Sequence, residues 1–577
     1  DKDGMLVKAK NSENLLEFTR DRKTGQIIEE KQGEHIVSRT YDGEGNCTRI
    51  TSSLGADIRH TYDREGNLQT MQAGESWQAS WVRDNTGLEV QRTFSGGVTV
   101  STERDRFGRE VRKSVRSGGI ERGAYRYEWG IANRLLSKEN ELTGTVMRYD
   151  YDRFDFLIRQ ETTQGSETDV IYRVPDFVGN LFGTPDRKDR KYGAGGKLLE
   201  DPDCFYHYDD EGNLIFREFK QLQETGVRYD RKRMEKERGI RCLATGTGWL
   251  YEWASNGMLK KVIRPDGRPV EFRYDALGRR TAKQYFGKVT HWVWDGNVPI
   301  HEWSYRISDM QPDKEENGPS KEPTEDITTW VFEVGTFVPT AKIQEGKQYS
   351  IVSDYLGTPI QMYNELGNKI WECTLDIFGE VTNFEGNSLN DCPFRYQGQY
   401  KDEETELYYN RFRYYSQEIG GYLSQDPIRL AGNNPTIYGY VRDTCTNTDP
   451  FGLMPWPNPI NSGHHLVYAN KARSVGLDHL ASNTDTPTYF FNEPYAPGTH
   501  ERVHASQRKF VGPRQGPWTG SAEELIEASK KGLIGLDDIK GKLIIPSTGE
   551  ILAENATPLE AFEKLEEWHK RKMASIH

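Results

Sequence analysis

A tyrosine- and aspartate-centred unit recurs along this chain, and its period constrains the fold more than any other feature of the sequence. Successive copies lie 21 to 23 residues apart, and the clearest ones combine a tyrosine, an aspartate and a glycine-containing turn. A regular period of this length indicates stacked supersecondary units, each too small to bury its own hydrophobic face. The clearest copies are residues 41–46, 62–68, 208–214 and 274–279.

The sequence of one unit predicts its local structure. The alternation in Glu271-Phe272-Arg273-Tyr274 indicates a strand with one buried face. The aspartate and glycine that follow predict a tight turn in which the glycine takes a positive φ. The abundance of glycine (56 residues), tyrosine (30) and tryptophan (13) favours strands and turns over helical bundles. We therefore expect a mostly β chain of stacked hairpins.

These units resemble the YD repeats of the Rhs (rearrangement hotspot) family, and the resemblance extends to about residue 390. The period alone implies stacked hairpins, whereas the resemblance implies a spiral β-sheet that closes into a hollow shell. We accordingly expect residues 1–349 to be a fragment of a YD-repeat β shell. Residues 307–326 are polar and charge-rich and contain proline, which predicts an exposed insertion or a disordered loop.

Residues 350–453 carry several linked motifs that resemble the Rhs-associated core. The motifs run from Asp-Tyr-Leu-Gly-Thr-Pro at 354–359, through Phe-Arg-Tyr-Gln-Gly-Gln-Tyr at 394–400, to Asp-Pro-Phe-Gly-Leu at 449–453. In that family the core is an aspartyl autoprotease that cleaves after its DPxGL motif. The resemblance therefore implies that the chain cleaves itself between Leu453 and Met454.

Two aspartates and one arginine are the candidate residues for this cleavage. Asp426 and Asp449 can divide the work, one ionised as the base for a water molecule and one protonated as the acid. Arg413 would hold one carboxylate or polarise the scissile carbonyl group. The alternative is that both Asp-Pro pairs simply begin turns and that Arg413 is an ordinary ion-pair partner.

The composition changes after Leu453, because seven of the twelve histidines lie in residues 454–577. Most of the formal net charge of −12 lies before that point, which argues against a chain that coats nucleic acid along its whole length. The six cysteines show no C-x-x-C spacing, so we expect reduced thiols in a protein made in the cytosol. The sequence contains no run of about 18 apolar residues, so it predicts no membrane span.

Residues 454–577 suffice for one small α+β domain. Gly498-Thr499 predicts the start of a helix with His500, His504 and Arg508, and a Ser-Ala-Glu-Glu capping box at 521–524 predicts the start of another. Pro558 predicts the start of a last helix with an apolar stripe. The other predicted elements are strands at 462–468 and 488–492, a helix at 469–475, and a hairpin of 542–546 with 550–552.

A Gly-His-His doublet ahead of a helical histidine pair resembles the GHH-type toxins of the HNH/endonuclease VII nuclease class, whose fold is ββα-metal. The resemblance implies that His465 is the general base, and that His464, His500 and His504 hold a divalent metal ion, because residues i and i+4 of a helix share a face. The metal could be Mg, Mn, Ni or Zn. Asn492 would orient the base, with Asn483 as the alternative. The candidate phosphate contacts are Arg502, Arg508, Lys509 and Arg514.

A second motif in the same helix supports a different class of enzyme. Residues 500–504 spell H-E-x-x-H, the signature of zinc metallopeptidases, with Glu501 as the base and Glu524 at a spacing compatible with a third ligand. The polar flanks of this motif and the unused histidine doublet count against that interpretation. A cargo without enzymatic activity is the third alternative, and the absence of a long apolar stretch argues against a pore.

Together these expectations describe a bacterial Rhs effector with a toxin domain at 454–577. The shell would enclose the toxin domain, cleave it and retain it inside until delivery. The expected substrate is nucleic acid, preferentially DNA, and the expected partners are a cognate immunity protein and a secretion apparatus of type VI. The chain would be made in the bacterial cytoplasm, secreted, and delivered to the cytoplasm of a target cell. It begins at Asp1, so we expect a fragment or processed product of a longer protein.

Overall fold

The computed structural model describes residues 5–224, 226–310, 323–429, 436–453, 465–480, 486–491, 499–512, 518–545 and 550–574. The chain divides into two compact units. One unit comprises Asp1–Thr19, Glu30–Val37 and Thr145–Trp456, and the other comprises Arg20–Glu29, Ser38–Gly144 and Pro457–His577.

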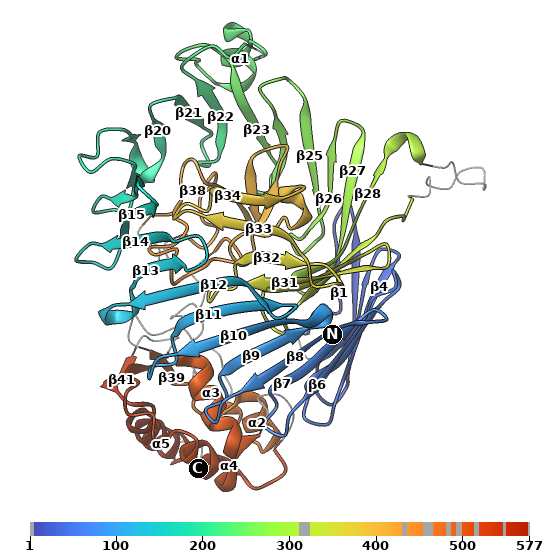
Figure 1. Cartoon of the computed structure of the whole chain (residues 1–577), viewed down its shortest axis with the longest axis vertical. Helices are drawn as coiled ribbons and strands as arrows, with labels where there is room; N and C mark the ends of the chain where they lie inside the picture. The colour runs from blue at the N-terminus through green and yellow to red at the C-terminus, as the bar shows by residue number, and fades with distance from the viewer. Residues whose placement is uncertain are drawn as a thin grey trace. The chain divides into compact units, whose positions relative to one another are not determined.

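The first long sheet is an antiparallel meander whose strands follow one another in chain order (Figure 1). Each strand pairs with its sequence neighbour through a short turn, as the repeat predicts. Its strands are β1 (Lys8–Lys10), β2 (Leu15–Arg20), β3 (Ile27–Gln32), β4 (His35–Tyr41), β5 (Cys47–Ser52), β6 (Asp57–Tyr62), β7 (Leu68–Ala73), β8 (Trp77–Arg83), β9 (Glu89–Phe94), β10 (Val98–Arg104), β11 (Glu110–Ser117), β12 (Ile120–Trp129), β13 (Leu135–Asn140), β14 (Thr145–Tyr151), β15 (Leu157–Gln164) and β16 (Glu167–Tyr172).

The second long sheet repeats this topology, after a two-stranded pair of β17 (Val174–Pro175) with β18 (Leu181–Phe182). Its strands are β19 (Lys191–Tyr192), β20 (Leu198–Glu200), β21 (Cys204–Tyr208), β22 (Leu214–Phe219), β23 (Gly248–Trp253), β24 (Leu259–Ile263), β25 (Pro269–Tyr274), β26 (Arg280–Tyr285), β27 (Lys288–Asp295), β28 (Val298–Arg306), β29 (Thr328–Phe332), β30 (Pro339–Gln344), β31 (Lys347–Ser353), β32 (Pro359–Tyr363), β33 (Lys369–Leu375) and β34 (Val381–Gly386). A helix that the repeat does not predict, α1 (Arg231–Arg238), is inserted between β22 and β23.

In many of the units an aspartate organises the turn. In the unit at 62–68, one carboxylate oxygen of Asp63 accepts the backbone N–H groups of Glu65 and Asn67, both at 2.9 Å, and its other oxygen accepts the Asn67 side-chain amide at 3.0 Å. Gly66 has a φ of 79°, which is strained for residues with a Cβ atom. The predicted turn chemistry is therefore confirmed.

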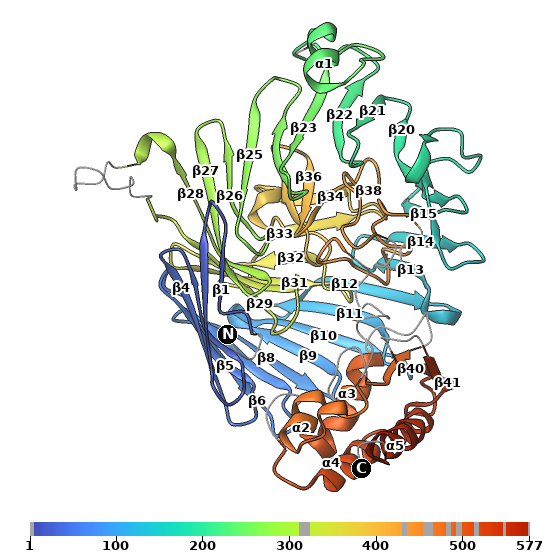
Figure 2. The ribbon, with the colours of Figure 1, turned by 180° about the vertical axis from the view of Figure 1, so that it is seen from behind.

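The predicted alternation of side chains is also confirmed. In β25, Val270, Phe272 and Tyr274 are buried, whereas Arg273 is exposed. The buried faces of β21 to β27 pack with aromatic residues of the segment that follows the second sheet, including Tyr409 and Tyr414. This contact places the residues after β34 against the sheet (Figure 2).

The segment after β34 forms a four-stranded antiparallel sheet that is almost entirely buried. Large hydrophobic side chains and tyrosines fill this sheet and its surroundings. The tyrosine hydroxyl groups donate hydrogen bonds to backbone carbonyls. Its strands are β35 (Tyr400–Asp402), β36 (Leu407–Asn410), β37 (Arg413–Ser416) and β38 (Gly421–Tyr422).

Residues 465–574 form a small α+β domain whose three strands pair antiparallel in the order β39-β40-β41, with helices packed against them (Figure 2). The elements are α2 (Ala469–Ser474), a 3-10 turn η7 (Asp478–Leu480), β39 (Thr488–Phe491), α3 (Thr499–Val511), α4 (Ala522–Lys531), β40 (Gly541–Ile545), β41 (Glu550–Ala556) and α5 (Pro558–Ala574).

Most predictions for this domain are confirmed. The capping box of Ser521 and Glu524 begins α4, and α5 begins at Pro558 and buries Phe562 and Leu565 in the core. The strand predicted at 462–468 is wrong where it can be judged, because residues 465–468 form a bend that packs on α3. Among the described residues, each helix falls short of the length and apolar character needed to cross a membrane.

The six cysteines, all within the described residues, form no disulfide with one another. The predicted insertion at 307–326 begins with a 3-10 turn at Ile307–Asp309, and its residues 311–322 lie outside the described residues.

Candidate functional site

The tip of the β36–β37 hairpin holds the segment 449–453. The side-chain amide of Asn410 donates to the carbonyl oxygen of Asp449 at 2.7 Å, and the backbone N–H of Phe412 donates to the carbonyl of Phe451 at 3.2 Å. Because strand pairing fixes the hairpin, these two bonds fix the position of the Asp-Pro-Phe-Gly-Leu motif.

Arg413 joins the three predicted parts of this site. Its Nη2 atom lies 2.9 Å from Oδ2 of Asp426 and 3.5 Å from Oδ2 of Asp449, while its Nε donates to the carbonyl oxygen of Gly452. Its guanidinium group also lies over the ring of Tyr422, 3.7 Å from the centroid. Asp426, Asp449 and Arg413 are each no more than 3% exposed, so the structure brings the three predicted residues together in a buried cluster.

Asp449 has hydrogen-bond donors on both carboxylate oxygens. Tyr422 donates its hydroxyl to Oδ2 at 2.9 Å, and the backbone N–H of Leu453 donates to Oδ1 at 2.9 Å. The hydroxyl of Tyr440 accepts the backbone N–H of Asp449 at 3.3 Å. Donors directed at a carboxylate favour its ionised form.

The surroundings of Asp426 favour the opposite protonation state. Burial raises the pKa of Asp426, and the charge of Arg413 and the backbone N–H of Ile428 only partly oppose this effect. Burial and the nearby Asp449 carboxylate hold the pKa of Tyr422 well above its usual range, so its hydroxyl stays a donor. The two carboxyl groups therefore have different surroundings: burial raises the pKa of Asp426, whereas Asp449 accepts hydrogen bonds on both of its oxygens.

Glycines allow the close approach that this segment needs. Gly452 has a φ of 67°, and a Cβ there would lie 2.6 Å from the carbonyl oxygen of Asn410. A Cβ at Gly398 would lie 2.3 Å from the Cα of Pro450. Both contacts need backbone atoms that only glycine leaves uncovered.

Sequence reasoning missed Asn410, Tyr422 and Tyr440 at this site. Asn410 directly follows the Leu-Tyr-Tyr run of β36 and precedes Arg413 by three residues, so a search for polar side chains at the hairpin tip could have found it. Tyr422 carried no such signal, because the chain has 30 tyrosines.

The second predicted site, in the domain at 465–574, is described only in part. His464, Asn492, Asn483 and Arg514 lie outside the described residues, as do the side chains of His500 and Glu501. The predicted set of metal ligands therefore stays a prediction. The described part of the chain contains no group of three or more His, Cys, Asp or Glu side chains that could hold a metal ion.

The described part does bring the doublet segment and the histidine helix together. His504 Nδ1 lies 3.2 Å from the hydroxyl of Tyr468, and Gln507 donates its amide to the carbonyl of Leu466 at 2.8 Å. The residues directly after His465 therefore pack on the turn of α3 that carries His504.

The predicted phosphate contacts have different surroundings. Arg502 forms a two-bond ion pair with Asp538, with distances of 2.9 and 3.3 Å, and Lys509 donates to the carbonyl of Asn85 at 3.0 Å. Arg508 is half-buried. Glu524, the possible third ligand of a metallopeptidase, accepts the Ser521 N–H at 2.7 Å in the cap of α4.

A histidine pair in this domain was not predicted. His479 of η7 and His569 of α5 stack with ring centroids 4.9 Å apart, and Nε2 of His479 lies 2.7 Å from Nδ1 of His569. Burial and then the neighbouring His479 lower the pKa of His569. The two residues are 90 positions apart, and no spacing in the sequence indicates their contact.

Comparison with known proteins identifies the class of the chain. The Teneurin YD-shell family model matches residues 89–437, more than half of the sequence. The chain therefore belongs to the Teneurin YD-shell family. A second family model, Toxin protein PT1, matches residues 460–573 and so covers the small domain.

The curated relatives include two probable deoxyribonucleases with Rhs names and two proteins named as toxins, which supports an Rhs/YD-repeat polymorphic toxin. The probable deoxyribonuclease RhsA of Dickeya dadantii is 26% identical over 462 residues, covering 78% of this chain and 29% of that protein. The double-stranded DNA deaminase toxin A of Burkholderia cenocepacia is 26% identical and covers 76% and 30%. The toxin protein Tse5 of Pseudomonas aeruginosa is 26% identical over 541 residues, covering 79% and 39%. The chain thus spans less than half of each of these relatives.

Solved structures agree with the fold. The Tc holotoxin pore of Photorhabdus luminescens has a TM-score of 0.52 at 17% identity, and covers 78% of this chain and 24% of that chain. The TcdB2-TccC3-Cdc42 structure has a TM-score of 0.51 at 16% identity, with the same coverage. This likeness establishes the expected fold class, mostly β with large antiparallel sheets.

Proposed function

We propose that residues 350–453 form an aspartyl autoprotease that cleaves the bond between Leu453 and Met454. The observation that carries this proposal is the buried Arg413 guanidinium, which joins Asp426, Asp449 and the Gly452 carbonyl one residue before the bond. An ion pair that only stabilised the fold would not need both aspartates and the motif backbone in one cluster.

The unequal surroundings of the two carboxyl groups assign their roles. Asp449, with donors on both oxygens, is the ionised base that takes a proton from water, and that water attacks the carbonyl carbon of Leu453. Asp426, whose pKa is raised by burial, gives its proton to the leaving nitrogen of Met454. The C–N bond breaks, leaving a carboxylate on Leu453 and an amine on Met454. Arg413 stabilises the negative charge that develops during this step.

The test is the intact mass of the purified chain and of three variants. Cleavage gives fragments of residues 1–453 and 454–577 from the wild type, and a single 577-residue chain from Asp449→Asn and Asp426→Asn. Asp443→Asn is the matched control, because Asp443 is also buried with a raised pKa but forms no contact with Arg413. Cleavage at Leu453 in both aspartate variants would refute the assignment.

We further propose that residues 454–577 are a toxin with metal-dependent nuclease activity of the HNH-like class, acting on DNA. Three observations support this: the match to the Toxin protein PT1 family, the deoxyribonuclease and DNA deaminase names of relatives, and the packing of the segment after His465 on the histidine helix α3. His465 is the proposed base, and His464, His500 and His504 are the proposed ligands of a divalent ion, which would stabilise charge on the phosphate.

Plasmid nicking by residues 454–577, with Mg²⁺, Mn²⁺, Ni²⁺ or Zn²⁺ against EDTA, tests this second proposal. We expect metal-dependent nicking that is lost in His465→Ala and kept in Glu501→Ala. Loss in Glu501→Ala alone, together with cleavage of a protein substrate, would favour the H-E-x-x-H metallopeptidase. The capping role of Glu524 argues against that alternative. Cleavage of RNA, but not DNA, in a parallel reaction would identify a ribonuclease. Inactivity on DNA, RNA and protein would favour a cargo without enzymatic activity.

The remaining parts of the proposal follow from the family. The shell would retain the cleaved toxin until a secretion apparatus, of type VI by the family precedent, delivers it to the cytoplasm of a competing cell. A cognate immunity protein would protect the producer. Co-expression of the toxin domain with the neighbouring gene product, scored as rescue of growth, tests the immunity partner.

A further inference from the structure

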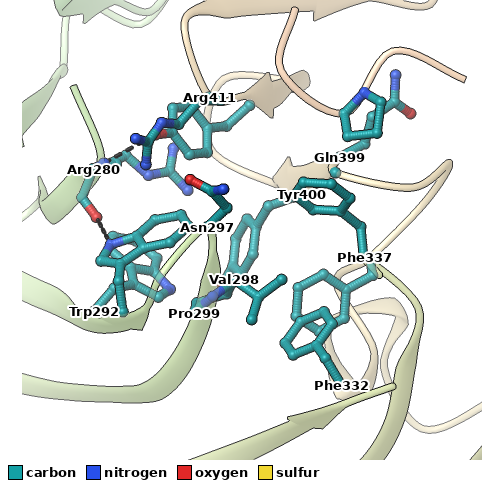
Figure 3. Close-up of a pocket in the computed structure, with 15 residues that line it drawn as sticks. Arg280, Trp292, Asn297, Val298, Pro299, Phe332, Phe337, Gln399, Tyr400 and Arg411 are labelled. Carbon is teal, nitrogen blue, oxygen red and sulfur yellow. Dashed lines mark hydrogen bonds between the residues drawn. The ribbon is translucent and has the colours of Figure 1, made fainter. Parts of the chain in front are cut away.

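A small cavity borders the Asp-Pro-Phe-Gly-Leu motif. Pro450 lines it together with Arg411, the residue between Asn410 and Phe412, which hold the motif. Figure 3 shows Arg280, Arg411 and Asn297 grouped on one side of this cavity, and the rings of Tyr400, Phe337 and Phe332 on the other. The ring of Trp292 lies on the first side and Gln399 lies on the second, so both walls combine aromatic and polar groups.

Arg411 is a buried cation whose donors are largely unused. Only 8% of the residue is exposed, its Nη2 donates to the Leu277 carbonyl at 3.1 Å, and its Nε and Nη1 have no hydrogen-bond partner. Within the described part of the chain, Arg411 forms no ion pair, since the nearby Glu30 and Asp275 are paired with Arg279. Burying a guanidinium group without a direct counter-charge is costly.

The other polar groups of the cavity do not supply that counter-charge. The charge of Arg280 is matched by Asp402, and its guanidinium stacks on Trp292 at 4.4 Å. Gln399 is fully buried, and neither its amide nitrogen nor its amide oxygen has a partner. Among the described residues that line the cavity, none is acidic. The lining thus offers unused donors and one positive charge that lies near the rings of Trp294 and Phe412 but has no carboxylate partner among the described residues.

We propose that this cavity binds a small monovalent anion, of the size of a halide or formate ion, through Arg411 and Gln399. The cavity volume is about 30 Å³, and one water-sized occupant needs roughly 10–15 Å³ by this measure, so the space suits a small ion. An anion would accept from Nε and Nη1 of Arg411 and from the amide nitrogen of Gln399, which are donors without partners.

Occupation of the cavity would also stabilise the cleavage segment. Arg411 has a φ of 54° at the hairpin tip, an unfavourable conformation for a residue with a Cβ atom. An anion that holds its guanidinium group would hold the backbone that positions Asn410 and Phe412. The proposal does not depend on cleavage, because Arg411 and Gln399 take no part in the proposed cleavage step.

Bromide titration of the full chain tests this inference. At constant ionic strength, bromide replaces fluoride while the midpoint of thermal unfolding is measured, and crystals grown in bromide are examined for anomalous scattering. We expect a saturable rise of about 2–3 °C at a hundredfold excess over the dissociation constant, and a bromide peak beside Arg411. Formate should compete with bromide for the same peak.

Variants separate specific binding from a general salt effect. Arg411→Met should remove the peak and the saturable rise, and Gln399→Leu should weaken the apparent affinity several-fold. Arg395→Met is the matched control, because Arg395 is also buried with unused donors but does not line the cavity; it should keep both signals. No peak in the wild type overturns the proposal. A bromide peak in the wild type that is not accompanied by a saturable rise in the unfolding midpoint, or whose rise persists in Arg411→Met, shows an adventitious ion only. That outcome also overturns the proposal.

Discussion

Removal of a single hydroxyl group from Tyr422 provides a sharp test of the proposed division between acid and base. Tyr422→Phe keeps the ring beneath the guanidinium of Arg413, where it lies 3.7 Å away, and deletes only the hydrogen bond to Oδ2 of Asp449. Tyr422 is 2% exposed, so water cannot readily replace the hydroxyl. We therefore expect the variant to fold and to keep the contact between the aromatic ring at position 422 and the guanidinium group of Arg413.

The magnitude follows from the bond that is lost. A hydrogen bond to a charged group contributes roughly 1.5–3 kcal/mol. One pKa unit corresponds to about 1.4 kcal/mol, so losing this bond raises the pKa of the base by about 1–2 units. Because the base acts when ionised, cleavage is lost as the pH falls through that pKa. The acid side of the pH profile should therefore move upward by about 1–2 pH units, with little change at high pH.

The chain is pulse-labelled during cell-free translation, and the translation reaction is stopped in urea. Dilution into buffers from pH 4.5 to 9 then allows the chain to refold and cleavage to begin. The fragments 1–453 and 454–577 are quantified over time for the wild type and Tyr422→Phe. Tyr396→Phe is the control, since its hydroxyl donates to the Asp376 carbonyl and does not touch Asp449. An unchanged profile, or a shift toward lower pH, would refute the assignment of Asp449 as the base.

Other predictions concern the same site and the toxin domain. Asp449→Asn and Asp426→Asn should each slow cleavage at least about 100-fold, measured as uncleaved chain, since an acid or base contributes that much or more. Gly452→Ala should also slow cleavage without preventing folding, because its Cβ would meet the Asn410 carbonyl; circular dichroism checks the fold. Burial and His479 lower the pKa of His569, so the folded domain binds fewer protons than the unfolded chain. Its free energy of unfolding in urea should therefore fall as the pH drops below about 6.5, and His569→Gln should reduce this dependence.

The sequence predicted what depends on local geometry. The period of the YD unit places an aspartate at many of the turns, and Asp63 accepts the N–H groups two and four residues later, as the turn requires. The capping box of Ser521 and the start of α5 at Pro558 follow equally local rules. The cluster of Asp426, Asp449 and Arg413 was predicted through the family motif rather than through any local rule.

What could not be predicted depends on contacts between distant residues. The helix α1 interrupts a repeat whose period gave no indication of it. His479 and His569 are both ordinary histidines in the sequence, and only the packing of η7 against α5 brings them together. Tyr422 is one of many buried tyrosines, and its role depends on which carboxylate its hydroxyl reaches.

The meander topology has a consequence for how the chain is made. Each strand of the two long sheets pairs with the strand synthesised just before it, so most of the loops that must close are short and their entropic cost is small. A nascent chain can therefore add one hairpin at a time as it leaves the ribosome, without waiting for distant partners. The hydrogen-bond partners of Asp449 described above, together with Arg413 and Asp426, lie within 410–453, near the end of this order. The order of chain synthesis would then set the time of cleavage, because the cleavage cluster can form only after the sheets that precede it in the sequence have formed.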